Sequence, residues 1–453
     1  RRYCEKDSLK EMPKNKCFFG VWTTSKNDGQ MFVMSSLSMA SHAQTLPEVV
    51  NQALQTYPAV LSASVRAAAT RSDIARARSA HYPQLGLNAT ATAFSSGSVP
   101  VGTERSSISP TARINLWSGG KIEAEAERAE ALSLASEHLH ADTLDDVAVL
   151  AAEAYLNWAK TADLYSLAVR NVNAHRETLN DIQKISKADT GRRVDFEQAL
   201  VRMENATLAL QQRKSDFAQA IQRVRRFWKG EMDARPVNLE SDVLDTGVLG
   251  KVPASLGQAM ALVSDDLPSI AQARAQVSAA QAAVRLAKGQ YWPTVDLAVS
   301  RQLNTSTGRH EAFTQLQVTA PFYNGGGTSA LVEGAVGQLK SAEFSLEEAR
   351  ILARENAAIA WQDWASALAR ANTGSSQSLV GEKLVTAYRD QFRVARRSLL
   401  DLLNIQADVF NYRSAAQAAF HDERLARVRL LAATGDLARR FSAESGRVSP
   451  PAR

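Results

Sequence analysis

The chain has 453 residues, of which 45% are hydrophobic, and a formal net charge of +6. This weak basic excess forms no stripe interleaved with aromatic residues, which argues against nucleic acid as a partner. No apolar run approaches the roughly 18 to 20 residues that a transmembrane helix needs. The two cysteines, Cys4 and Cys17, both lie in the first 43 residues and leave the rest of the chain without a thiol.

Residues 1–43 read as an N-terminal extension that ends in a signal peptide. A weakly apolar segment, Met31 to Ala40, is followed by Ser41-His42-Ala43. Small residues after an apolar segment are typical of a secretory cleavage site. We therefore expect export, with cleavage after Ala43.

A first repeat is expected over residues 44–235. Thr45 caps a short helix that runs to Thr56, and Pro58 begins a second helix. Apolar and polar residues then alternate on either side of a loop rich in Gly, Ser and Pro, which predicts a β-hairpin at about 84–117. The apolar face of this hairpin carries Leu85, Leu87, Ala89, Ala91, Ala93, Ile108, Pro110, Ala112, Ile114 and Leu116.

The stretch from Lys121 to Thr190 contains neither proline nor glycine. As one helix it would span roughly 100 Å. Apolar residues recur at steps of three and four from Leu144 to Val172, which is coiled-coil spacing. The segment Arg192 to Lys229 can fold back along it as an antiparallel partner.

The same landmarks return in the second half of the chain. Pro58 and Pro268 are 210 residues apart, and Gly119-Gly120 and Gly325-Gly326 are 206 apart. We therefore expect a linker at 236–254, a second repeat at 255–440 with a hairpin at about 294–323, and a tail at 441–453. Poor helix formers from Asn372 to Ser376 predict a kink or a short break in the second long helix.

Ten-residue segments of alternating hydrophobicity are a weak signature of membrane strands. Two soluble hairpins packed on a core remain an open alternative. Bulky aromatic residues at the open ends of both hairpins favour a membrane interface; they are Tyr82, Trp117, Tyr291, Trp292, Phe322 and Tyr323. Because closed barrels need about eight strands and lipid tolerates no open edge, membrane strands would require an oligomer.

These residues together resemble the TolC family of outer-membrane efflux and secretion ducts. The resemblance rests on Tyr82-Pro83, Trp292-Pro293, Leu116 to Gly120, Phe322 to Gly326 and Arg397 to Asn404. It implies a mainly α fold with membrane β: duplicated long antiparallel coiled-coil helices plus two β-hairpins per chain. A homotrimer would then complete a twelve-stranded barrel and a helical tunnel, in the bacterial outer membrane with a long periplasmic portion.

The resemblance also implies passive export through docking to a periplasmic adaptor and an inner-membrane ABC or RND transporter, with outer-membrane lipid around the barrel. Leu399 to Leu403 and Arg429 to Gly435 look most like the branch for type I secretion of proteins. Multidrug efflux is the alternative within this class. A non-membrane coiled-coil scaffold is the alternative of another class.

By the same resemblance, the two helical turns would form a periplasmic gate. Asp401 would belong to a constricting acidic ring, with Arg397 and Asp195 where the family links neighbouring coils in its closed state. The chain departs from the family pattern in three places. Asn404 occupies a second acidic gate position, and Asp189 and Ala395 occupy positions that glycine often fills in the family. The remaining turn residues are Gly191, Arg192, Arg193 and Arg396.

Nothing in the sequence supports catalysis. Gly119-Gly120-Lys121 lacks the spacing of a phosphate loop, and a strand-to-helix turn explains it better. His138 and His140 are two apart on a helix and point in different directions. We therefore expect no catalytic residue, cofactor or metal.

Overall fold

The computed structural model describes residues 45–91, 106–230, 252–304, 310–435 and 437–445. The expected signal segment, most of the linker and the end of the tail therefore lie outside the described residues. The helices are α1 (Leu46–Thr56), α2 (Pro58–Arg78), η1 (Ser79–His81), α3 (Lys121–Ala188), η2 (Thr190–Arg192), α4 (Arg193–Val224), α5 (Leu256–Ala261), α6 (Pro268–Gly289), α7 (Gly327–Arg393), α8 (Leu399–Ala433) and α9 (Leu437–Ser445). The strands are β1 (Gln84–Ala91), β2 (Ser106–Trp117), β3 (Thr294–Asn304) and β4 (His310–Thr319).

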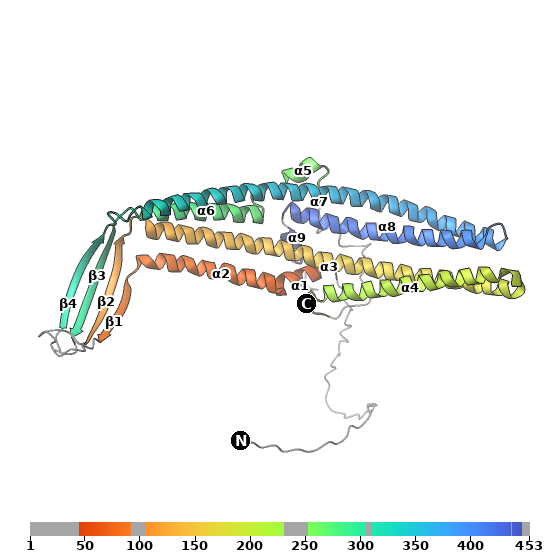
Figure 1. The fold of residues 1–453 in the computed structure, drawn as a ribbon, viewed down its shortest axis with the longest axis horizontal. Coiled ribbons are helices and arrows are strands. Elements are labelled where there is room, and N and C mark those ends of the chain that lie inside the picture. The colour runs from red at the N-terminus through yellow and green to blue at the C-terminus, as the bar shows by residue number, and fades with distance from the viewer. Residues whose placement is uncertain (1–44, 92–105, 231–251, 305–309, 436, 446–453) are drawn as a thin grey trace, which may run out of the picture. The chain divides into compact units, whose positions relative to one another are not determined.

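Two long helices, α3 and α7, organise the other helices (Figure 1). Between the sheet and the middle of the bundle, α2 packs on α3, α3 on α6, and α6 on α7. Beyond the middle, α4 pairs with α3 and α8 with α7, while α3 also contacts α8. None of the helices in the described ranges is long and apolar enough to cross a membrane.

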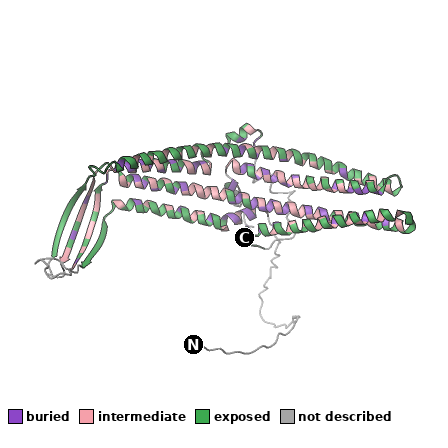
Figure 2. Ribbon diagram, in the orientation of Figure 1, coloured by how far each residue is buried: buried purple, intermediate pink, exposed green. Residues whose placement is uncertain are grey.

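The main core lies where α1, α3, α8 and α9 meet, and buried residues concentrate there (Figure 2). Trp158 on the predicted seam is 1% exposed and contacts Tyr155 edge-on at 5.5 Å between ring centroids. Phe441 of α9 is fully buried in the same cluster. The seam of α3 therefore becomes the centre of the core because helices from both ends of the chain close over it.

The short break expected between Asn372 and Ser376 is wrong, since α7 is one uninterrupted helix of 67 residues. The kink, the other expectation for this segment, stays a prediction. Gly374 lies against Ala416 of α8, and a Cβ on it would be 3.0 Å from the Ala416 Cα. Close packing on a neighbouring helix, rather than chain flexibility, explains this glycine. Tertiary contacts here outweigh the low intrinsic helix propensity of the segment.

The strands form one antiparallel sheet in the order β1-β2-β3-β4. Pairing of β2 with β3 joins the two hairpins, with a register shift between Asn115 and Trp117. Strand β4 ends at Thr319, short of the expected boundary at 323. Pro321 accounts for this early end because proline has no N–H to donate to the strand ladder.

The elements α2, β1, β2, α3 and α4 are followed later by α6, β3, β4, α7 and α8 in the same order. All of the described residues belong to one unit, 43–453. The boundaries 44–235, 236–254, 255–440 and 441–453 stay predictions.

Candidate functional site

The apolar face of the sheet lacks the burial expected for a sheet packed on a soluble core, and the edge strands β1 and β4 are exposed on both faces. On the apolar face, Leu85 is 83% exposed and Leu87 68% exposed. On the polar face, Ser107 and Asp296 are only 8% and 5% exposed. An exposed face of large apolar side chains indicates a surface that lipid or protein covers. The described helices do not cover it.

The sheet also has two free edges among the described residues. Strand β1 pairs only with β2, and strand β4 pairs only with β3. Each outer side therefore offers a row of backbone N–H and C=O groups to another strand. Strands of neighbouring copies, one at each edge, would satisfy these groups.

The bulky aromatic residues lie where the strands meet the helices. Trp117 and Trp292 contact edge-on, with ring centroids 6.3 Å apart. Gly119 has φ +66°, and a Cβ there would lie 2.4 Å from the Trp292 Cβ, so only glycine fits. Gly119 and Gly120, both with positive φ, make the turn from strand β2 to helix α3, as the sequence predicts. All six aromatic residues are exposed, namely Tyr82, Trp117, Tyr291, Trp292, Phe322 and Tyr323. Their role at a membrane interface stays a prediction.

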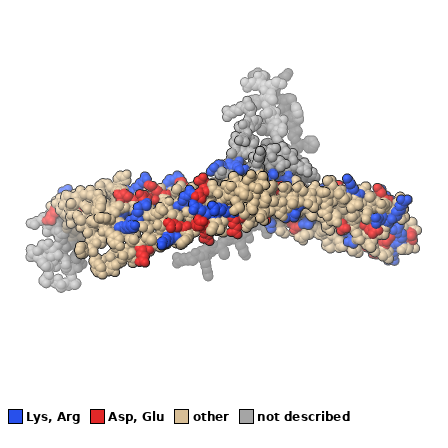
Figure 3. Space-filling view, turned by 90° about the horizontal axis from the view of Figure 1, so that it is seen from above, with Lys and Arg blue, Asp and Glu red and all other residues tan. Residues whose placement is uncertain are grey.

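At the opposite end, the tip turns (residues 188–195 and 394–401) join α3 to α4 and α7 to α8. The Asp189 carboxylate accepts a hydrogen bond from the Gly191 N–H at 3.0 Å, which closes the first turn. Ser398 caps α8 by accepting from the Asp401 N–H at 3.1 Å. Figure 3 shows cationic and anionic side chains mixed at this end of the helices.

The predicted gate charges find partners within one chain. Arg192 binds Asp195 at 2.8 Å. Arg397 lies 3.9 Å from Asp401 and stacks over the Tyr388 ring at 4.3 Å. The structure therefore does not pair Arg397 with Asp195 inside one chain.

The other predicted tip residues differ in how far they are engaged. Asn404 accepts from Arg202 at 3.0 Å and so joins α8 to α4. Arg193 lies 4.0 Å from Glu197, and Arg396 is exposed. The amide at position 404 is thus already bound to an arginine of a neighbouring helix.

An apolar cluster lies between the helices next to the tip turns. Ile182 of α3, Ala199 of α4, and Leu399 and Leu403 of α8 are buried together. A cavity of about 630 Å³ opens beside them between the two helical pairs, and Arg389, Arg393 and Arg397 are among its lining residues. The pair α3–α4 and the pair α7–α8 therefore touch through this apolar cluster. Beside the cluster they enclose a cavity with several arginines in its wall.

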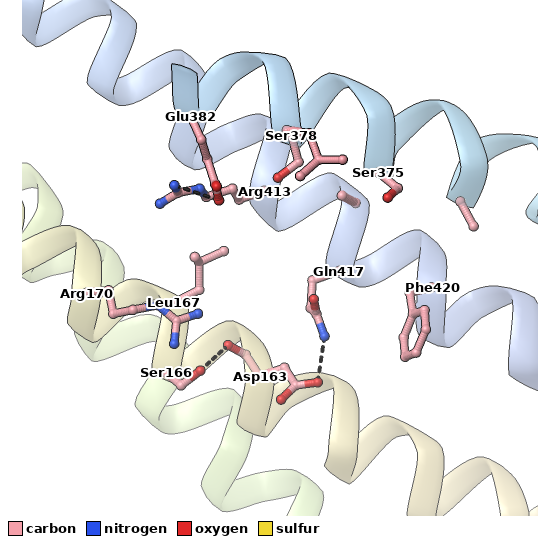
Figure 4. A pocket seen from close by; sticks show the side chains of 13 residues that line it. Asp163, Ser166, Leu167, Arg170, Ser375, Ser378, Glu382, Arg413, Gln417 and Phe420 are labelled. Carbon is pink, nitrogen blue, oxygen red and sulfur yellow. Dashed lines mark hydrogen bonds and ion pairs between the residues drawn. The ribbon is translucent and has the colours of Figure 1, made fainter. Parts of the chain in front are cut away.

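Polar contacts that sequence reasoning missed join α3 to α8 (Figure 4). Asp163 accepts from Gln417 at 2.7 Å, and the buried His421 Nε2 lies 2.7 Å from the same carboxylate oxygen. Nearer the tip, Gln406 donates to Thr178 at 3.1 Å. A cavity of about 710 Å³ adjoins this seam. Only the fold reveals these contacts, because their partners are more than 200 residues apart in sequence.

Ala395 adopts φ +55° and is the non-glycine residue with positive φ in the described chain. A left-handed conformation costs an L-residue about 1 to 2 kcal/mol. We expect Ala395→Gly to raise the free energy of unfolding by about 0.5 to 1 kcal/mol once the greater flexibility of glycine is included. Chemical unfolding in detergent checks this, with Ala395→Val as the opposite control. A destabilising Ala395→Gly would contradict the strain assignment.

Comparison with protein families matches the chain to the outer membrane efflux protein family over residues 49–228 and 262–436. The chain belongs to this family. Its members are channels rather than enzymes. Family membership places the protein in the bacterial outer membrane, with a helical tunnel in the periplasm.

Two curated relatives illustrate the match. The outer membrane efflux protein BepC of Brucella suis is 26% identical over 293 residues, which is 63% of this chain and 62% of BepC. Protein CyaE of Bordetella pertussis is 23% identical over 406 residues, covering 87% of this chain and 84% of CyaE. The chain thus aligns with about three fifths of BepC.

A solved structure of CusC has the same fold, with a TM-score of 0.76 at 18% identity over 86% of this chain and 92% of that one. The resemblance to TolC-like channels is therefore confirmed. The family match, the relatives and the solved structure fit type I secretion and drug efflux equally.

Proposed function

We propose that this protein is one subunit of a homotrimeric duct that exports cargo passively across the outer membrane and periplasm. The observation that carries the proposal is a four-stranded sheet with an exposed apolar face and two unpaired edges. Lipid around that face would remove its leucines from water, and strands from neighbouring copies would pair the edges. Three such sheets supply twelve strands, above the roughly eight that closure requires.

The duct performs no chemistry on its cargo. The described residues provide a polar sheet face and long helices that can line a water-filled path. Energy and cargo selection would come from an inner-membrane ABC or RND transporter, joined through a periplasmic adaptor at the tip turns. A non-membrane scaffold accounts less well for the sheet, because its apolar face is not packed against the described helices.

Fractionation tests this proposal directly. Outer-membrane fractions analysed without boiling are expected to contain a trimer that heat converts to monomer. A folded monomer in the soluble fraction would support the scaffold instead.

At the tip, Asp401 would contribute to an acidic ring from three copies, while Asn404 supplies no charge. The Arg202–Asn404 hydrogen bond, by joining α4 to α8, would replace repulsion between acids with a link between helical pairs. Arg397 and Asp195 would restrain the closed state through contacts with neighbouring copies.

The gate hypothesis predicts that Arg397→Ala raises the resting conductance of the purified trimer in planar bilayers. Each exposed link contributes only about 0 to 1 kcal/mol, so loss of three equivalent links shifts the closed state by at most about 3 kcal/mol. Arg396→Ala is the matched control, since Arg396 is the neighbouring exposed arginine. No increase over the unmodified duct for Arg397→Ala, or an equal increase for both variants, would count against the assignment.

For the cargo, we propose protein secretion of the type I kind, supported by the motif-like run from Leu399 to Leu403 and by Arg429 to Gly435. Efflux of small molecules is the second candidate, because BepC and the solvent pump component SrpC of Pseudomonas putida are named as efflux proteins. Gene deletion separates the two. Loss of secreted proteins with unchanged drug sensitivity supports secretion, and the converse supports efflux.

A further inference from the structure

A charge cluster on the polar face of the sheet lies where β2 meets β3. The Arg113 Nη2 donates to the Asp296 Oδ2 at 2.5 Å, and the Asn115 Nδ2 donates to the other oxygen at 2.9 Å. The Asp296 side chain is 6% exposed, whereas that of Arg113 is 58% exposed. The carboxylate is therefore covered on both oxygens, and the guanidinium is the accessible charge.

The backbone holds this cluster in place. Asn115 is the register partner of Asp296, and the register shifts by one residue immediately after it. Such bulges re-aim side chains and often lie beside functional positions. Arg113 is opposite Ala298, whose small side chain leaves room for the guanidinium to reach diagonally to Asp296. Lys121 and Arg113 both line a hollow of about 270 Å³ at this level.

Few other charges share the polar face. Strand alternation and register place Arg113, Asp296 and Glu311 on it, and these are its charged residues within the described strands. Glu311 is opposite Gln302, six residues along β3 from Asp296, or roughly 20 Å away. At the end of the sheet next to the helices, Arg113 is thus the exposed charged side chain of the polar face within the described strands.

We infer that Arg113, held in position by the covered Asp296 carboxylate, forms with its copies a ring of accessible guanidinium groups that favours anions at the junction of sheet and helices. The inference rests on the proposed function, since it requires the polar face to line the path. The covered carboxylate limits the net charge of the ring, so the preference is moderate. Anionic groups on cargo would pass this level more readily than cationic ones.

Reversal potentials of purified trimers under a potassium chloride gradient test the inference. Because the proposed Asp401 ring lies on the same path and favours cations, the test is the change in the chloride-to-potassium permeability ratio between the unmodified duct and each variant. R113Q uncovers the carboxylate and should shift the chloride-to-potassium permeability ratio toward potassium by about fivefold, the effect of one unit charge a few ångströms away in water. D296N should shift the ratio toward chloride. R301Q is the matched control, because Arg301 lies on the opposite face of β3.

A charge swap, R113D with D296R, keeps the pair while reversing the accessible charge, and should form trimers whose permeability ratio is shifted toward potassium relative to the unmodified duct. The double variant tests the role of Arg113 even if the R113Q or D296N protein fails to form trimers. Unchanged reversal potentials in conducting R113Q and D296N trimers, or shifts in the same direction, would overturn the inference alone. Absence of trimers and of conductance in the unmodified protein would instead overturn the proposed function.

Discussion

Leu87→Lys is expected to abolish accumulation of the trimer in the outer membrane. Leu87 lies in the middle of β1, on the apolar face, and is 68% exposed in the single chain. A lysine facing lipid near the bilayer midplane costs about 2 to 4 kcal/mol, and three copies per trimer multiply that cost. Semi-native electrophoresis of outer-membrane fractions measures the result.

The adjacent residue provides a matched control. Asn88→Lys introduces the same charge at the same depth but on the polar face, since successive strand residues point to opposite sides. This variant should assemble normally. Equal loss of trimer in both variants would show that the two faces do not differ in environment, contrary to a lipid-facing apolar side.

Trp158→Ala is expected to lower the free energy of unfolding by about 3 to 5 kcal/mol, as for other fully buried tryptophans. The indole is 1% exposed in the core that unites α1, α3, α8 and α9. Removing it leaves a cavity that helices held from several directions cannot close. Chemical unfolding in detergent, followed by near-ultraviolet circular dichroism, provides the measurement.

Its counterpart in the proposed second repeat should behave differently. Trp364 is only partly buried and donates its Nε1–H to Glu423 at 2.9 Å. Trp364→Ala should cost clearly less, about 1 to 2 kcal/mol, because it loses one hydrogen bond and partial burial. A cost for Trp364→Ala that equals or exceeds that for Trp158→Ala would contradict the location of the main core.

Local periodicity explains which elements the sequence could predict. Alternation over Gln84 to Trp117 identified the first hairpin, and absence of proline and glycine after Lys121 identified the long helix, because both depend on neighbouring residues. The end of β4 could also have been predicted, since Pro321 stands in the expected strand. The break expected at Asn372 was wrong because the packing of Gly374 on Ala416 depends on a distant segment.

The candidate site was less accessible from sequence. The sequence alone showed that Ala395 stands where the resemblance leads one to expect glycine. The structure supplies the reason for that expectation, because the backbone there has positive φ. The partners of the tip charges were not predictable, because exposed arginines and aspartates on helices have many possible neighbours. Likewise, Arg113 and Asp296 are 183 residues apart and meet only through the register of β2 with β3.

Cysteine cross-linking of the free sheet edges tests the central claim most directly. Within one chain β1 and β4 are separated by three strand spacings, about 14 Å, too far for a disulfide, which needs Cα atoms within about 7 Å. Asn88→Cys on β1 is combined in turn with a cysteine on the same face of β4, at Phe313, Gln315 or Gln317. A chain substituted only at Asn88 serves as the control. The account predicts covalent dimers and trimers for at least one pair, and monomers alone for all three pairs would contradict it.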